Sequence, residues 1–502
     1  MSNLLYDRLF GCHQGEQKPF LIFADGSQQS YDSFLRQTAR FANVIQSIGL
    51  DVGDRLAAQI EKSAEALALY AACVQSGVIF LPLNTAYTPA EVSYFVGDSG
   101  AKLVVADQHF DLAAVASEHG AVLERLNADG SGSFADSAAT ASDIFATVPR
   151  GADDLAAFLY TSGTTGRSKG AMLTQNNLLS NAETLIGGWR FDANDVLLHA
   201  LPIFHTHGLF VATNIILLAK ASMIFLPKFS ADMVIDALPK ASSMMGVPTF
   251  YTRLLDDPRL TPDLTRHMRL FISGSAPLLA ETHIQFESRT GHRILERYGM
   301  TETNMNTSNP YDGERRAGTV GMALPGVDMK ITNPDNGETL VDGEIGQIEV
   351  RGPNVFVGYW NMPEKTREEL REDGFFITGD LGRIDEHGYL KIVGRNKDLI
   401  ISGGYNIYPK EIELVLDEQP GVLESAVIGA PHPDFGESVI GILVADGGQP
   451  VDLDAIEADL GKTLARFKQP RKLILVDSLP RNTMGKVQKN ILRDEFGSTF
   501  QG

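Results

Sequence analysis

The sequence of 502 residues contains only two cysteines, Cys12 and Cys73, which lie far apart. This excludes a disulfide framework and a cysteine metal site, and it is typical of a reducing compartment. Basic tracts are also absent: 43 Lys and Arg residues stand against 63 Asp and Glu residues, for a formal net charge of −20. Such a surface disfavours nucleic acid and anionic membranes as partners, so a small anionic substrate would need a locally positive site.

Long apolar runs are missing as well. No stretch approaches the roughly 18 uninterrupted apolar residues of a membrane-spanning helix, and the first residues lack the charged-then-apolar pattern of a signal peptide. We therefore expect a cytoplasmic protein. The spacing of a Walker A loop is absent too, because Ile456 occupies the place of the first glycine before Gly461-Lys-Thr463.

Strands and helices alternate through the first 300 residues. A helix is expected over residues 62–77, and residues 127–142 read as a surface loop because they are rich in Ala, Ser, Gly and Asp. The expected strands are 54–60, 78–82, 102–106, 155–160, 195–199, 222–226 and 270–273. This alternation predicts an α/β fold with mostly parallel, buried sheets.

The pattern changes after about residue 315, where glycine and proline become dense. Residues 343–350 and 388–393 read as hairpin strands of a small β unit. Beyond them we expect a compact α+β module with helices over 409–417 and 453–467 and strands over 425–429, 440–445 and 472–476. The sequence thus predicts a large N-terminal domain over 1–394, comprising the α/β sheets and the small β unit, and a mobile C-terminal α+β domain over 395–502.

The most informative segment is Thr161 to Gly170, which holds three glycines, five hydroxyl side chains and two cations in ten residues. So little side-chain bulk cannot pack a core, but it lets backbone N–H groups approach an anion, with hydroxyls and Lys169 to complete the contact. Because an expected buried strand precedes it, the segment favours a phosphate-binding loop over a flexible linker.

Five further segments carry candidate chemistry, each with a simpler alternative. His205 and His207 could chelate a metal or gate a pocket, or belong to a polar loop. Residues 296–303 offer an aromatic ring for a base and a glutamate for a metal–phosphate group, or form a solvated turn. Asp380, between glycines, suits two ribose hydroxyls or an ordinary turn.

The last two of these segments lie in the C-terminal third of the chain. Residues 394–409 contain Arg395, Lys397 and a glycine pair that allows close approach by a thin ligand, although both cations could be solvated linker charges. Residues 480–489 place Lys486 in a loop beside a glycine, which is a weak signal when taken alone.

Taken together and in this order, the segments from about Tyr31 to Arg493 resemble the acyl-adenylate-forming superfamily, which includes acyl-CoA synthetases, peptide-synthetase adenylation domains and luciferases. The resemblance implies ATP and CoA as cosubstrates and Mg²⁺ as a cofactor. It assigns catalytic roles to Lys486, Glu302, Thr165 and His205, with Glu302 on Mg²⁺ and His205 at the entry of the CoA thiol. It makes Lys397 the hinge of the C-terminal domain.

The ligand-binding residues that the resemblance implies form two groups. ATP would contact the phosphate loop, an adenine wall, the ribose residues and the terminal lysine: Thr161, Ser162, Gly163, Thr164, Thr165, Gly166, Lys169, Gly274, Ser275, Ala276, Tyr298, Gly299, Met300, Thr301, Asp380, Arg395 and Lys486. The CoA tunnel would be lined by Ser402, Gly403, Gly404 and Tyr405. A carboxylate would attack the α-phosphate, pyrophosphate would leave, and the CoA thiol would then displace AMP.

Arg297, immediately before the adenine-wall tyrosine, bears on which acid is activated. The motif with this arginine is similar to the corresponding motif of malonyl-CoA and methylmalonyl-CoA synthetases. A dicarboxylate keeps one unreacted carboxylate in the acyl pocket, and burying that charge requires a cation. Arg297 is the first candidate and Arg253 the second, with His205 and Met300 also lining the acid site; Arg297 pointing to solvent or pairing with Glu296 is the alternative.

Three other functions remain open from the sequence. A short-chain or aryl monocarboxylate:CoA ligase would share every nucleotide motif. A free-standing adenylation enzyme loading a carrier protein would need an acidic residue for a substrate amine. A non-catalytic nucleotide-binding regulator is disfavoured because Lys486 and Glu302 are both present. Lys486 is also a candidate for a lysine acetyltransferase and deacetylase, since acetylation would remove its charge.

Overall fold

The computed structural model describes residues 3–161, 168–402, 405–482 and 485–500. The chain separates into two compact units: unit 1 comprises Met1–Asp328 and Val350–Phe376, and unit 2 comprises Met329–Glu349 and Ile377–Gly502. Among the described helices, none combines the length with the apolar composition that crossing a bilayer requires.

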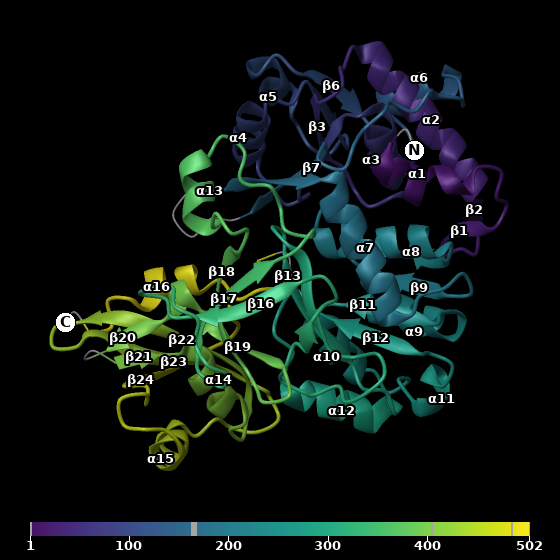
Figure 1. The fold of residues 1–502 in the computed structure, drawn as a ribbon. Coiled ribbons are helices and arrows are strands. Elements are labelled where there is room, and N and C mark those ends of the chain that lie inside the picture. Colours follow the sequence, from purple (N-terminus) through teal and green to yellow (C-terminus); the bar gives the residue numbers. More distant parts are fainter. Residues whose placement is uncertain (1–2, 162–167, 403–404, 483–484, 501–502) are drawn as a thin grey trace. The chain divides into compact units, whose positions relative to one another are not determined.

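The larger sheet of unit 1 has nine strands and lies mainly in the teal part of Figure 1. Its order is β15 (Met322–Ala323), β14 (Asn304–Ser308), β13 (Leu295–Met300), β12 (Leu270–Ser273), β11 (Ser243–Gly246), β9 (Val196–His199), β10 (Ser222–Phe225), β1 (Pro19–Ile22) and β2 (Gln28–Ser30). The strands from β13 to β1 pair in parallel. The carboxyl ends of β9, β11, β12 and β13 therefore share one edge, where α/β sheets bind their ligands.

The second sheet of unit 1 has six strands, in the purple-to-blue part of the chain (Figure 1). Its order is β6 (Val122–Arg125), β5 (Leu103–Ala106), β3 (Arg55–Gln59), β4 (Ile79–Pro82), β7 (Leu155–Thr161) and β8 (Lys169–Thr174). Only its last pair, β7 with β8, is antiparallel, and it sets Thr161 opposite Lys169. The sequence predicted β7 but not its hairpin partner.

Helices of unit 1 begin and end where the local sequence specifies. Ser63 and Thr88 accept N-cap hydrogen bonds, and Gly77 and Gly100 end their helices in the left-handed conformation. The α-helices are α1 (Leu4–Leu9), α2 (Tyr31–Ile48), α3 (Ala64–Ser76), α4 (Pro89–Ser99), α5 (Ala113–Glu118), α6 (Ser133–Thr140), α7 (Gln175–Trp189), α8 (Asn214–Ala219), α9 (Ala231–Ala237), α10 (Pro248–Leu255), α11 (Pro262–Thr265), α12 (Ala280–Thr290) and α13 (Pro363–Glu369).

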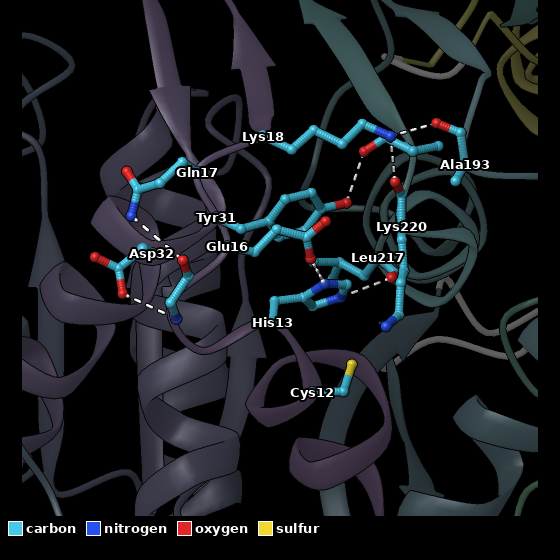
Figure 2. Close-up of polar contacts among 12 residues, drawn as sticks. Cys12, His13, Glu16, Gln17, Lys18, Tyr31, Asp32, Ala193, Leu217 and Lys220 are labelled. Atoms are coloured by element: carbon cyan, nitrogen blue, oxygen red, sulfur yellow. Dashed lines mark hydrogen bonds and ion pairs between the residues drawn. The ribbon is translucent and has the colours of Figure 1, made fainter.

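A polar clamp fastens the N-terminal segment to the end of α8 (Figure 2). His13 is fully buried between the Glu16 carboxylate, at 3.0 Å, and the carbonyl of Leu217, at 2.9 Å. Tyr31 donates to the Ala221 carbonyl at 2.6 Å, and Lys18 donates to the carbonyls of Ala193 and Lys220. The clamp gives backbone carbonyls near the end of α8 side-chain donors from the N-terminal segment. It thereby fixes the far end of a helical stretch that begins with the π-helical turn His207–Thr213.

Unit 2 is built on two smaller sheets. One is ordered β16 (Asp328–Thr332), β17 (Gly346–Arg351), β18 (Phe376–Ile384) and β19 (Leu390–Arg395). The other is ordered β21 (Tyr405–Ile407), β20 (Ile400–Ser402), β23 (Gly436–Ala445) and β22 (Val422–His432), with β24 (Lys472–Val476) beside β23. Its helices are α14 (Pro409–Asp417), α15 (Leu453–Thr463) and α16 (Lys489–Phe496).

The sequence predictions hold for fold class and for most elements, with two corrections. Residues 127–142 are not only a loop, because they contain α6, where buried Phe134 packs edge-on against Phe41 of α2 with ring centroids 5.1 Å apart. The helix expected over 453–467 ends at Thr463, because Leu464 takes an extended conformation. Tertiary packing in the first case, and local backbone conformation in the second, outweigh the residue composition.

Candidate functional site

The predicted acid and adenine residues of unit 1 gather at one edge of the nine-stranded sheet. His205 and His207 follow β9, Gly274 follows β12, and Arg297 and Tyr298 lie in β13. Because these strands are parallel, their carboxyl ends bring segments about 100 residues apart in sequence to the same edge. The edge brings together Arg297, His207 and Ser275.

Arg297 is the main electrostatic feature of this edge. Its side chain is buried, with 3% exposure, and its Nε and Nη2 atoms have no hydrogen-bond partner among the described residues. The guanidinium packs against Gly274, where any Cβ would overlap it. Burial lowers the pKa of Arg297 to about 9, so the group keeps its charge at neutral pH. A buried cation without an anion is costly, and this one is poised to receive an anionic group.

His207 lies beside this cation. Its ring is 1% exposed, its Nδ1 lies 3.2 Å from the Ser275 hydroxyl, and its Nε2 has no partner among the described residues. Burial first, and then the charge of Arg297, hold the pKa of His207 well below its usual range. A neutral imidazole, a hydroxyl and a guanidinium can together donate several hydrogen bonds to one carboxylate.

Two buried contacts hold the histidine loop in place. The Thr206 hydroxyl donates to Asn304 Oδ1 at 2.8 Å. His199, at the end of β9, lies 2.9 Å from the Gly208 carbonyl through Nε2 and 2.9 Å from Lys62 Nζ through Nδ1. The Gly208 carbonyl can only accept, so Nε2 carries the ring proton and Nδ1 accepts from Lys62. Sequence analysis missed Lys62 and His199, because a lone lysine after a strand carries no signal.

The predicted phosphate residues form a second network, also in unit 1. Thr161 Oγ1 lies 3.4 Å from Glu302 Oε1, and the Tyr359 hydroxyl lies 3.1 Å from the same oxygen. Tyr359 also lies 2.7 Å from Glu369 Oε2, and Glu369 pairs with Lys169. Burial raises the pKa of Glu302. Tyr359 and Glu369 were not predicted, although the aromatic pair after Gly358 was a readable signal for the first.

The remaining predicted residues of this region differ in their surroundings. Tyr298 is 8% exposed, and a bulge after it brings Gly299 so close to the Asn304 carbonyl that only glycine fits. Ala276, Met300 and Thr301 are half-buried. Arg253, the second candidate cation, is exposed on α10, so nothing places it at the acid site. Among the described residues, no three His, Cys, Asp or Glu side chains form a group that could hold a metal ion.

The ribose and terminal-lysine candidates lie in unit 2. Asp380 in β18 is buried and lies 3.1 Å from Arg395 Nε, directly opposite it in β19. The Lys486 N–H donates to Asn482 Oδ1, and the Lys486 carbonyl accepts from the Asn482 N–H, both at 2.9 Å. Lys489, at the start of α16, anchors the segment through a buried pair with Glu413 at 2.5 Å.

Several predicted residues lie outside the described part of the chain: Ser162, Gly163, Thr164, Thr165, Gly166, Gly403 and Gly404. The flanking CoA candidates are described. Ser402 is half-buried at the end of β20, and Tyr405 is exposed and stacks on Phe467 with ring centroids 4.5 Å apart. Lys397 is exposed in a short helical turn after β19.

Comparison with known proteins agrees with this geometry. Residues 11–360 match the family model of AMP-binding enzymes, and residues 411–486 match that of the AMP-binding enzyme C-terminal domain. A malonate–CoA ligase of Arabidopsis thaliana is 36% identical over 94% of this chain and 85% of its own length. A feruloyl-CoA synthase of an Amycolatopsis species is 34% identical, covering 94% and 95%.

A solved structure extends the likeness to the whole fold. ATP-bound MatB from Rhodopseudomonas palustris superposes with a TM-score of 0.97 and 59% identity, covering 99% of this chain and 100% of that one. Two family models together span most of the chain. The Arabidopsis relative is above 30% identity along nearly the whole length of this chain. The chain therefore belongs to the family of AMP-binding enzymes.

Proposed function

We propose that the protein is an AMP-forming malonate:CoA ligase that makes malonyl-CoA through an acyl-adenylate. The observation that carries this is the buried Arg297 guanidinium, whose Nε and Nη2 lack a hydrogen-bond partner among the described residues. A monocarboxylate with an apolar tail would leave that cation unpaired, whereas the second carboxylate of malonate would neutralise it. The malonate–CoA ligase and MatB relatives support the same acid.

The reaction has two steps. In the first, one malonate carboxylate oxygen attacks the α-phosphorus of ATP, a P–O bond forms, and pyrophosphate leaves. In the second, the CoA sulfur attacks the acyl carbon, the thiol proton is lost, and AMP leaves with the electron pair of the acyl–oxygen bond. The carboxylate is already nucleophilic, so the protein contributes position and charge neutralisation. Lys486 is proposed to bridge the carboxylate and the α-phosphate.

Nucleotide and CoA contacts are proposed as the sequence predicts them. Tyr298 would stack on adenine beside Gly274, Ser275 and Ala276, and Asp380 supported by Arg395 would accept the ribose hydroxyls. The loop that includes Thr165 would hold the phosphates. His205 would gate the thiol path, and Ser402, Gly403, Gly404 and Tyr405 would line it. Met300 would close the acid pocket near the α-carbon.

A magnesium ion is proposed at Glu302. Its carboxylate is 4% exposed, burial raises its pKa, and no lysine or arginine nitrogen of the described residues pairs with it. A buried carboxylate with no ion pair to the described residues, and with the Thr161 hydroxyl 3.4 Å away, fits an oxygen-preferring metal. Bound there, Mg²⁺ would offset charge on the phosphates.

Replacing Glu302 tests the metal proposal. We expect Glu302→Gln to raise the Mg²⁺ concentration needed for half-maximal pyrophosphate release by about tenfold or more, because one charge-assisted ligand is lost. The control is Glu281→Gln, which removes the same charge from an exposed position on α12. An unchanged Mg²⁺ dependence in Glu302→Gln would place the metal elsewhere.

The domain division at 394/395 and the hinge at Lys397 also remain proposals. Lys397→Pro would fix one backbone angle at the turn after β19. We propose that the C-terminal domain rotates about this hinge between the two steps. We therefore expect adenylation to survive within about twofold while thioester formation falls by about tenfold or more, because only the second step follows the rotation. The two steps are measured separately, as malonyl-adenylate formation without CoA and as malonyl-CoA formation from supplied adenylate. If both survive, the pivot lies at another residue.

The cellular location of the protein and its regulation by modification are also proposals. A cytoplasmic enzyme remains the expectation from the sequence. We also propose that a lysine acetyltransferase inactivates the enzyme at Lys486 and that a deacetylase restores it, because acetylation would abolish the bridging charge.

The decisive functional experiment is pyrophosphate release across a panel of acids. We expect malonate to be turned over with CoA-dependent thioester formation, and acetate, butyrate and benzoate to react poorly. Preference for a monocarboxylate would favour the alternative ligase, and transfer to a carrier protein without CoA activity would favour a free-standing adenylation enzyme.

A further inference from the structure

Lys169, the predicted phosphate-binding lysine, already holds an anion of the protein itself. Its Nζ lies 3.0 Å from both carboxylate oxygens of Glu369, the last residue of α13. The same ammonium lies 4.2 Å from the centre of the Tyr359 ring. The two side chains are only 13% and 21% exposed, so water screens the pair weakly. Two acceptor oxygens and one cation–π contact engage the charge of Lys169.

Glu369 has partners that do not depend on Lys169. The Tyr359 hydroxyl is 2.7 Å from Oε2, and Lys365 Nζ is 3.0 Å from Oε1. Although burial opposes it, hydrogen bonds from Tyr359, Lys365 and Lys169 hold the pKa of Glu369 below its usual value. Tyr359 and Lys365 therefore still hold the Glu369 carboxylate if Lys169 turns away.

Tyr359 links this pair to the proposed metal carboxylate. Its hydroxyl lies within hydrogen-bond distance of both Glu369 and Glu302 but has a single proton to donate. A phosphate anion beside Lys169 would lie next to Glu369, and like charges at that distance repel. A phosphate on Lys169 would therefore compete with Glu369 for the same ammonium.

We propose that Glu369 is a placeholder for the ATP phosphates: it holds Lys169 when no nucleotide is bound, and the phosphates must take its place on the ammonium. This inference rests on the proposed use of ATP and adds a positioning residue that limits nucleotide affinity. Lys365 and Tyr359 hold the carboxylate where it is, so it does not follow Lys169 to the phosphates. The cost of the exchange weakens ATP binding and favours release of pyrophosphate.

The test is a double-mutant cycle read as ATP affinity by calorimetry, with Mg²⁺ and without malonate or CoA. We expect Glu369→Gln to lower the Kd for ATP by about three- to tenfold, because removing one competing charge partner is worth up to one factor of ten. We expect Lys169→Met to raise the Kd and to abolish the gain from Glu369→Gln when the two are combined. The inhibition constant for pyrophosphate should fall in parallel with the Kd.

The matched control is Glu368→Gln. This neighbour on α13 also pairs with Lys365, at 2.9 Å, but is 64% exposed. It should leave the Kd for ATP unchanged. Weaker or unchanged ATP binding by Glu369→Gln, or a gain that persists without Lys169, would overturn the placeholder while leaving the ligase proposal intact. Wild-type protein that does not bind ATP would overturn both.

Discussion

Replacing Arg297 with alanine should lower kcat/KM for malonate by at least tenfold to a hundredfold. A hydrogen bond to a charged group contributes about 1.5–3 kcal/mol, and about 1.4 kcal/mol corresponds to a factor of ten. The effect is expected because the buried guanidinium has two unpartnered nitrogens among the described residues, and the second malonate carboxylate would lose its counter-charge. The measurement is pyrophosphate release over a range of malonate concentrations.

The ratio of malonate to butyrate activity separates selection from simple loss of function. Butyrate should be hurt less than malonate or should improve, because it gains room and no longer buries an unpaired cation. Arg253→Ala is the control, since that arginine is exposed on α10 and its removal should leave the ratio unchanged. An unchanged ratio in Arg297→Ala would make Arg297 structural and remove the main support for malonate.

Replacing Lys486 with alanine should nearly abolish adenylation, by about a hundredfold or more, since a charge aimed at the transition state is worth roughly 2.7–4 kcal/mol. The backbone of this lysine is held by Asn482, and nearby Lys489 pairs with Glu413, so the truncation should not disturb the fold. The variant should still convert supplied malonyl-adenylate and CoA to malonyl-CoA, because the second step needs no bridge to the α-phosphate. Both half-reactions are measured separately.

Two further forms of the protein test this prediction. Protein acetylated only at Lys486 should behave like the alanine variant, because the charge is lost while most of the side chain remains. Lys472→Ala removes an exposed lysine of the same unit and should be silent. Equal loss of both half-reactions in Lys486→Ala would refute a role confined to adenylation, and full activity of the acetylated protein would refute the regulatory proposal.

Local sequence was sufficient for most of the scaffold. The predicted strand over residues 270–273 and the helix over 409–417 coincide with β12 and α14, because short apolar runs and a proline at the helix start specify them locally. Residues 127–142 were misread, because α6 depends on Phe134 reaching Phe41 on a distant helix. The motif order was likewise sufficient to identify the family.

The sequence by itself determined the family, the alternation of strands and helices, and the residue types available for catalysis. Only the tertiary structure decided which charges meet. Arg297 is unpaired at Nε and Nη2 among the described residues because the fold buries it against Gly274 at a sheet edge, and Lys169 is paired because β8 and α13, 200 residues apart, come together. Neither contact follows from the spacing of residues in the sequence, because contacts between distant segments depend on how strands and helices pack. Burial then sets how strongly each charge interacts with its neighbours.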